Sequence, residues 1–371
     1  MVPSSPTLRK TPLNAWHRAH GGRMVEFAGW ELPESFGDSR EEHLAVRSRA
    51  GLFDRGGTGL VEIAGADALA AIQLMTSNDA GRLQAGQVQH SALTTPEGTF
   101  LDELLVYRLA ASHFLLALNA ANLRKDVAWI LDQAKRFADV AVVDTSSRYA
   151  VVSLQGPASR EVLQALTGAD LGSVDEFAFT YGEVAGARAT ISRTVWSGED
   201  GFDVLIPPSS ALRVWQAILQ EGADAGIVPA GLHALDTLRL EAAWRSYGAD
   251  IDETTSVLEA GLEAIVAWDK GDFNGRAALA EQQATGLSRR LVGFEMADAA
   301  VAHTGCDACI TGAKVGVVTS GAESPQLMKA IGLAYLPVAH AKTGTEFEVH
   351  VHGRRARARV VALPFYQRPK G

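Results

Sequence analysis

The chain has 371 residues, of which 47% are hydrophobic and 21% charged, so it is long enough for two or three folded domains and too apolar to be disordered. Its formal net charge is −9 and its acidic and basic residues are interspersed, which excludes the basic patch that binds nucleic acid. Because no segment has the length of a membrane helix or the apolar core of a signal peptide, we expect a cytoplasmic protein that binds no membrane.

The first half of the chain alternates irregularly between helix-like and β-branched segments, which predicts an α+β fold. Residues 38–50 begin with an Asp-Ser cap and predict a helix that ends at Gly51. A strand, a glycine turn and a capped helix are predicted over residues 61–74, and the same order recurs over residues 149–166. This repetition hints at two related subdomains.

A hairpin and a helix are predicted between these two repeated segments. Residues 99–108 and 113–118 are strand-like and close near residues 110–112. Residues 119–137 have helical spacing. The predicted strand at residues 113–118 therefore continues directly into the predicted helix at residues 119–137.

The character of the chain changes after a helical segment at residues 275–283 and a linker at residues 284–286. From Leu291 onward, short strands follow one another at regular intervals between glycine-rich turns, which predicts a small antiparallel barrel or sandwich. We expect one region at residues 1–280, made of two interleaved α+β subdomains, and a C-terminal β-barrel domain at residues 287–371.

The two cysteines, Cys306 and Cys309, form an isolated CxxC pair. With His303 they supply at most three of the four ligands of a structural zinc. We interpret them as small residues beside a glycine-rich turn and expect no metal site, with a redox or metal role as the alternative.

Several common catalytic motifs do not occur. The chain has neither a GxxxxGK[ST] nor a GxGxxG phosphate loop, and neither a GxSxG elbow nor an HExxH helix. Nucleotide binding through those loops, serine hydrolysis and zinc proteolysis therefore have no support.

Three polar segments are candidates for a site. In residues 196–202, two glycines bracket an acidic pair between two strands, which suits either a ligand-binding carboxylate or an ordinary hairpin turn. Asp102 and Glu103 begin an apolar strand, so one of them should point inward unless both lie in water at the strand end. Asp236 and Arg239 have the spacing of a helical ion pair.

Taken in order, these segments resemble the T-protein (aminomethyltransferase) family of the glycine cleavage system over nearly the whole chain. The matching segments are TPLNAWHRAHGGRMVEFAGWELP, HLAVRSRAGLFD, EGTFLDELLVYRL, LNAANLRKDVAW, SGEDGFDVLIP, GLHALDTLRLEAAWRSYGADIDETTSVLEAGL, TSGAESPQLMKAIGLAYLP and PFYQRP. The resemblance implies a three-domain, cloverleaf-like fold around a central folate site, with tetrahydrofolate as the one-carbon acceptor and lipoylated H-protein as the partner.

The resemblance also implies roles for individual residues. Asp102 is expected beside the reactive nitrogens of the folate, where its charge would stabilise an iminium-like carbon. Glu199 is expected to accept the two N–H donors of the pterin. Arg239 is expected near the folate and the substrate entrance, as a second catalytic residue, while Asn119 and Tyr247 are expected in the pocket wall.

The chain departs from the family pattern around the expected ligand. Arg55 to Gly59 replace a segment that contributes a methionine to the pterin pocket, and Trp196 stands where the family has a tyrosine, as a flat ring that can still stack. His90 also replaces a common tyrosine, and Glu103 replaces a second aspartate. We expect Trp196 and His90 to contact the folate.

Three functions are compatible with the resemblance. The first is transfer of the aminomethyl carbon from H-protein to tetrahydrofolate with release of ammonia. The second is a related folate-dependent demethylase that acts on a small methylated compound. The third is a non-enzymatic folate-binding protein of iron–sulfur maturation, but residues 261–279 lack the cysteine of that group's KGCYxGQE motif.

Overall fold

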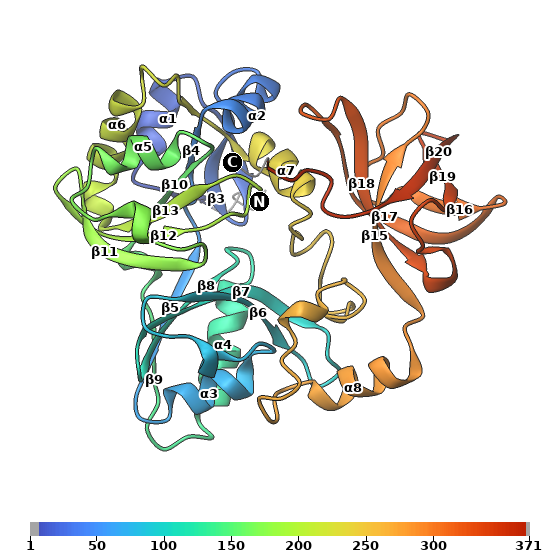
Figure 1. Cartoon of the computed structure of the whole chain (residues 1–371), viewed down its shortest axis with the longest axis horizontal. Coiled ribbons are helices and arrows are strands. Elements are labelled where there is room, and N and C mark those ends of the chain that lie inside the picture. Colours follow the sequence, from blue (N-terminus) through green and yellow to red (C-terminus); the bar gives the residue numbers. More distant parts are fainter. Residues whose placement is uncertain (1–6, 369–371) are drawn as a thin grey trace, which may run out of the picture.

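The computed structural model describes residues 7–368 and contains two large open β-sheets with their helices, a small three-stranded sheet and a closed barrel (Figure 1). We call the parts built on the six-stranded sheet, the five-stranded sheet and the barrel the first lobe, the second lobe and the barrel. Figure 1 shows them as three leaves around a central region. The expected α+β fold with a C-terminal antiparallel barrel is confirmed.

The first lobe is formed by the chain from β1 to β4 and by residues 150–241. Its sheet has the order β11-β12-β13-β10-β4-β14. These strands are β4 (Gly51–Asp54), β10 (Ala150–Gln155), β11 (Ala178–Val184), β12 (Ala187–Arg193), β13 (Gly201–Ile206) and β14 (Val228–Pro229). The helices are α1 (Asn14–Ala19), α2 (Ser39–Ser48), α5 (Ser159–Gln164), α6 (Ala211–Glu221) and α7 (Leu232–Glu241). Trp215 is fully buried in their shared core.

A small N-terminal sheet adds to this lobe. It consists of β1 (Arg9–Lys10), β2 (Arg23–Phe27) and β3 (Trp30–Ser35) in the order β1-β3-β2. Helix α2 begins where the sequence predicts, because the Asp38 side chain accepts a hydrogen bond from the backbone N–H of Arg40.

The second lobe contains a five-stranded sheet of order β6-β7-β8-β5-β9. Its strands are β5 (Gly59–Ala64), β6 (Val88–Thr94), β7 (Phe100–Ala110), β8 (His113–Leu118) and β9 (Ala141–Asp144). Its helices are α3 (Ala68–Met75), α4 (Leu123–Ala134) and α8 (Arg276–Thr285). The predicted hairpin is confirmed as β7 and β8, while α4 begins later and ends earlier than the predicted helix.

The two open sheets repeat one order of elements. β5, α3, β6, β7, β8 and α4 recur as β10, α5, β11, β12, β13 and α6. The sheets meet through a shared apolar cluster made of Leu60, Val88, Tyr107, Leu115, Val151, Phe179 and Leu205. Each lobe thus places one face of its sheet toward the other lobe.

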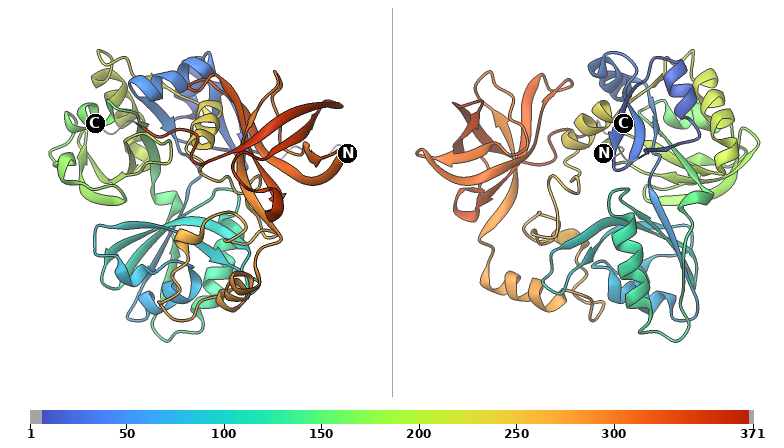
Figure 2. Two further views of the ribbon diagram at one scale, coloured as in Figure 1. Left: turned by 45° about the vertical axis from the view of Figure 1, so that its right-hand side comes forward. Right: turned by 180° about the vertical axis from the view of Figure 1, so that it is seen from behind.

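The barrel closes in the order β15-β18-β17-β16-β19-β20, and every pairing in it is antiparallel. Its strands are β15 (Arg289–Met296), β16 (Asp307–Ile310), β17 (Ala313–Ser324), β18 (Lys329–Pro337), β19 (Glu346–Val351) and β20 (Arg354–Val361). The two further views show it beside α7 and apart from the second lobe's sheet (Figure 2).

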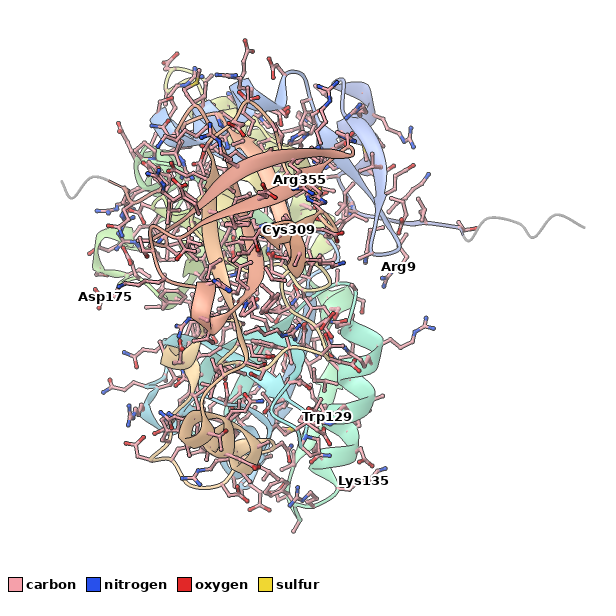
Figure 3. The ribbon with its side chains drawn as sticks, turned by 90° about the vertical axis from the view of Figure 1, so that its right-hand side faces the viewer. Arg9, Trp129, Lys135, Asp175, Cys309 and Arg355 are labelled. Carbon is pink, nitrogen blue, oxygen red and sulfur yellow. The ribbon has the colours of Figure 1, made fainter. Side chains whose placement is uncertain are left out.

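Strand β16 lies where the sequence predicts no strand, because Cys309 is interpreted there as a small residue beside a glycine-rich turn. Cys309 lies on this strand and is buried, and Figure 3 shows it within the barrel. Cys306 lies just before the strand and is partly exposed. Within residues 7–368, no group of three or more His, Cys, Asp or Glu side chains is arranged to hold a metal ion.

The described part of the chain also contains no helix that is both long and apolar enough to cross a membrane. The division into regions 1–280 and 287–371 stays a prediction.

Candidate ligand-binding and catalytic site

A cavity of about 700 Å³ lies where the two sheets face each other. Its wall combines β4 with β13 from the first lobe, β6, β7 and β8 from the second, and the segment after α7. The polar or aromatic residues discussed below that line it are Arg55, Thr58, His90, Glu103, Tyr107, Asn119, Trp196, Asp203, Asp236, Arg239, Trp244, Arg245 and Tyr247. A volume of this size suits a ligand as large as a cofactor or drug.

On the first-lobe side, the cavity wall contains a buried carboxylate with an oxygen that accepts no hydrogen bond from the protein. Asp203 lies on β13, and its Oδ1 has no hydrogen-bond partner in the described structure. Burial raises the pKa of Asp203, while the nearby Arg55 guanidinium and the polar side chains of Ser153, Thr194 and Trp196 oppose that rise. A buried acceptor without a partner costs free energy, and a ligand N–H donor could satisfy it.

An aromatic and a cation flank this carboxylate. The Trp196 ring packs edge-on against Phe53 at 5.3 Å, and its Nε1 donates to the Ser153 hydroxyl. The Arg55 guanidinium lies 5.1 Å from the Trp196 ring centroid. Thr58 also lines the cavity. The unusual loop at residues 55–59 therefore does border the site.

On the second-lobe side, a histidine and a glutamate are in contact. His90 Nε2 lies 2.5 Å from Glu103 Oε1, a close contact that lacks hydrogen-bond geometry, and both residues line the cavity. The His90 ring stacks on Trp244, with centroids 4.8 Å apart and planes 26° from parallel. Glu103 is 7% exposed.

Asp102 lies on the opposite face of β7 and does not line the cavity. Its carboxylate accepts hydrogen bonds from the Asn119 backbone at 3.0 Å, the Asn119 amide at 2.8 Å and the Asn122 amide at 2.7 Å. Burial raises the pKa of Asp102, and hydrogen bonds from Asp126 and the two asparagines counteract this. Asn119 therefore stands between Asp102 and the cavity.

Asp102 and Glu103 are both buried, so the alternative of a strand end in water is wrong. Neighbouring residues on a strand point to opposite sides. The second lobe covers one side of β7 and the cavity lies on the other, so each carboxylate has its own buried surroundings.

Glu199 also lies outside the cavity lining. It is 3.2 Å from Arg47 Nη1, and Arg47 donates to Glu241 Oε2 as well. The ring of Tyr366 lies over the Arg47 guanidinium at 3.9 Å. Because the Arg47 cation engages it, Glu199 belongs to a buried charge network and lacks a free edge toward the cavity.

Arg239 lines the cavity, but protein partners occupy its guanidinium. It donates to Asp236 at 2.7 Å, to Asp250 at 2.5 Å and to Ser320 of the barrel at 2.9 Å. Burial alone would lower the pKa of Arg239, but the two carboxylates raise it. The predicted pair with Asp236 is confirmed, and the same group connects α7 to the barrel.

Tyr247 lines the cavity as well. Its hydroxyl accepts a hydrogen bond from Lys125 Nζ at 2.8 Å, and burial raises its pKa. Lys125 also contacts Glu253 at 2.8 Å.

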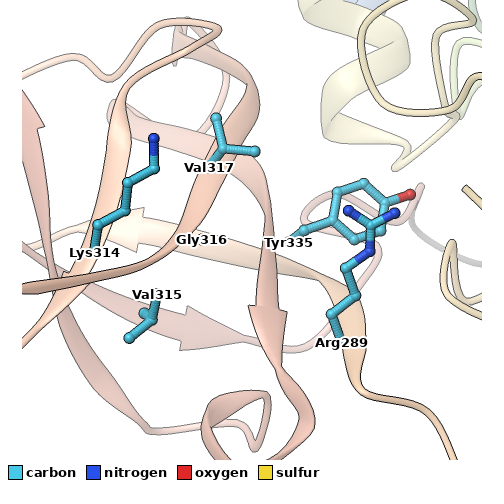
Figure 4. A pocket seen from close by; sticks show the side chains of 6 residues that line it. All are labelled: Arg289, Lys314, Val315, Gly316, Val317 and Tyr335. Atoms are coloured by element: carbon cyan, nitrogen blue, oxygen red, sulfur yellow. The ribbon is translucent and has the colours of Figure 1, made fainter. Parts of the chain in front are cut away.

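A second hollow, of about 580 Å³, lies on the barrel (Figure 4). Its two cations have carboxylate partners, Arg289 with Glu259 at 2.9 Å and Lys314 with Asp307 at 2.6 Å. Figure 4 shows the Arg289 side chain beside the Tyr335 ring. The hollow lacks the free carboxylate and the cluster of motifs that the cavity between the sheets has, so we place the site in that cavity.

Asp203 is not among the site residues predicted from the sequence, and Glu103 appears there only as one member of the acidic pair with Asp102 and as a departure from the family pattern. The available signal was the two-residue period of strands, since Glu103, Leu105 and Tyr107 all line the cavity. That period could group residues on one face, but it could not tell which face borders the cavity.

Comparisons with known proteins agree over both parts of the chain. The GCVT N-terminal domain matches residues 13–270, and the glycine cleavage T-protein C-terminal barrel domain matches residues 289–367. An aminomethyltransferase of Moorella thermoacetica is 45% identical over 98% of this chain and 99% of its own length, and one of Desulfitobacterium hafniense is 42% identical over 97% and 99%. The crystal structure of glycine cleavage system aminomethyltransferase T from Bartonella henselae has a TM-score of 0.91 at 30% identity, covering 97% of this chain and 98% of that one.

Proposed function

Because this chain belongs to the glycine cleavage T-protein family, we propose that it transfers the aminomethyl carbon of a lipoyl-bound donor to tetrahydrofolate, with release of ammonia. The aminomethyltransferase activity follows from the family and from curated relatives that are more than 40% identical over nearly the full length. The acceptor, the lipoylated H-protein as donor and the residue roles are the proposed parts.

The unpartnered Asp203 oxygen in the cavity supports folate as the ligand. A pterin has a 2-aminopyrimidinone edge with two parallel N–H donors, and a carboxylate can accept both. Trp196 beside it offers a flat face for the ring. We therefore assign the pterin-binding role to Asp203 in place of Glu199.

The reaction forms two bonds between the transferred carbon and folate nitrogens, and it breaks the bonds of that carbon to sulfur and to the amine. The two folate protons end on ammonia and on the lipoyl sulfur, so no redox partner is required. Positive charge develops on the carbon as it passes between nitrogen atoms, and a carboxylate stabilises that charge. Glu103, which faces the cavity, is the acid that we place there.

We assign the other site residues predicted from the sequence to the wall of the cavity or to the positioning of its side chains. Asp102 holds Asn119 through three hydrogen bonds and contributes negative charge from behind the wall. Tyr247 and His90 border the ligand. Because its guanidinium is fully engaged, Arg239 is a positioning residue.

Calorimetric titration with tetrahydrofolate, followed by addition of aminomethyl-loaded H-protein and detection of ammonia, tests the function. Folate binding with ammonia release would support it. Binding without release would favour a demethylase acting on a small methylated compound, and absence of binding would contradict the folate site.

Substitution of Asp203 tests the pterin assignment. We expect Asp203→Asn to raise the Kd for tetrahydrofolate roughly 10- to 100-fold, because the buried acceptor becomes an amide that pairs with only part of the pterin edge. Glu199→Gln is the comparison variant and should change the Kd much less. A larger loss for Glu199→Gln would return the role to Glu199.

A further inference from the structure

The contact between His90 and Glu103 follows from the pairing of β6 with β7. Ala92 pairs with Glu103, and His90 pairs with Leu105, so the two side chains are diagonal neighbours on one face of the sheet. Diagonal neighbours of this kind are within reach of long and aromatic side chains. That face borders the cavity.

Trp244 and Glu103 confine the His90 ring from two directions. Trp244 covers one side of the imidazole, and the Glu103 carboxylate contacts Nε2. The His90 side chain is 15% exposed. The ring is therefore confined and still reachable from the cavity. Arg245, which also lines the cavity, interacts electrostatically with Glu103.

We propose that His90 and Glu103 form a proton-transfer dyad for the one-carbon transfer, with His90 as the group that exchanges the proton. Histidine is the side chain best suited to exchange protons near neutral pH, and a carboxylate beside one ring nitrogen stabilises the protonated ring. This inference rests on the proposed function.

The proton balance is closed within the reaction. A folate amine loses its proton to the imidazole as its nitrogen bonds to the transferred carbon. The imidazolium then donates that proton to the departing ammonia, while the second folate proton ends on the lipoyl sulfur. Glu103 keeps its charge throughout and stabilises the imidazolium.

The same chain contains a matched control. His113 Nε2 lies 3.1 Å from Glu62 Oε2 in a hydrogen bond, and these residues are also diagonal neighbours, on β8 and β5. Neither borders the cavity between the sheets. A general effect of losing a cross-strand histidine–glutamate contact would therefore appear in both pairs, and a catalytic effect only in one.

The experiment compares the full-length protein with His90→Ala, Glu103→Gln and His113→Ala. Ammonia release from aminomethyl-loaded H-protein is followed at saturating tetrahydrofolate, with and without added imidazole, and folate affinity is measured in parallel. We expect His90→Ala to lower kcat roughly 100-fold, with folate affinity changed only a few-fold and part of the rate restored by imidazole. His113→Ala should retain the wild-type rate.

Because two residues that act as a unit are not additive, the double variant His90→Ala/Glu103→Gln should be little slower than the slower single variant. A wild-type rate in His90→Ala would overturn the dyad, as would a loss explained wholly by weaker folate binding or an absence of rescue by imidazole. An inactive wild-type protein would instead contradict the proposed function itself.

Discussion

At the residue scale, the neighbours Asp102 and Glu103 illustrate how a strand separates two roles. Glu103 faces the cavity, while Asp102 bonds to the amides of Asn119 and Asn122 at the start of α4. Asp126 lies on α4 beside Asp102 and is fully buried. Burial and the charge of Asp102 raise the pKa of Asp126 to about 10. At neutral pH it is therefore protonated and able to donate to Asp102.

Asp126 should make the folded protein less stable as pH rises. The unfolded chain ionises this group near pH 4, whereas the folded protein keeps the proton up to about pH 10. Between these values, the group lowers the free energy of unfolding by about 1.4 kcal/mol per pH unit. Asp126→Asn keeps a donor but cannot ionise, so the variant should gain stability relative to wild type between pH 5 and pH 9.

Urea unfolding of both proteins at pH 5, 7 and 9 measures this gain. The difference between variant and wild type removes the contribution of the other titrating groups. A difference that is the same at all three pH values would mean that Asp126 is ionised in the folded protein.

At the element scale, the turn between β10 and α5 depends on Gly156. Its φ is +128°, and a Cβ there would lie 2.5 Å from the Arg49 carbonyl oxygen and 2.6 Å from that of Val46. Gly65 has the corresponding place after β5, with φ +132° and a Cβ position 2.2 Å from the Asp139 carbonyl oxygen. Both halves of the repeat therefore require a glycine, because backbone passes too close for any side chain.

Gly156→Ala should destabilise the protein by roughly 2 to 4 kcal/mol, through backbone strain and contact with atoms that cannot move aside. Gly168→Ala is the control, since a Cβ there meets no atom within 4 Å. Chemical denaturation of the two variants measures the effect. Equal stability of both would contradict the close approach at Gly156.

At the scale of the whole molecule, the barrel is joined to the cavity wall by a buried polar cluster. Arg239 bonds to Asp250 and Ser320, and Asp250 Oδ1 accepts from Thr319 at 2.6 Å and Ser320 at 2.7 Å. The C-terminal segment adds a second connection, since the backbone N–H of Tyr366 donates to the Glu241 carbonyl oxygen at 2.9 Å. The cavity's α7 side thus depends on the barrel, although the barrel strands do not line it.

The substitution Arg239→Lys tests whether Arg239 positions the cavity wall or takes part in catalysis. A lysine cannot serve Asp236, Asp250 and Ser320 together, because it lacks the planar fork of arginine. We expect a lower Tm and faster proteolysis near residues 284–288, accompanied by a higher KM for folate. Limited proteolysis, thermal unfolding and steady-state kinetics check this. A fall in kcat with unchanged Tm and proteolysis would instead support the catalytic role first expected for Arg239.

Local patterns along the chain determined the family, the α+β class, the barrel and most strands, because these depend on side-chain period, turn residues and the order of motifs. Tertiary structure decided which carboxylates face the cavity. Glu199 and Asp203 are four residues apart, yet Arg47, far away in sequence, engages the first, while the second keeps a free oxygen in the cavity. A local sequence pattern could not predict this difference between the two carboxylates. The partners of a side chain depend on which surfaces of the folded lobes come into contact.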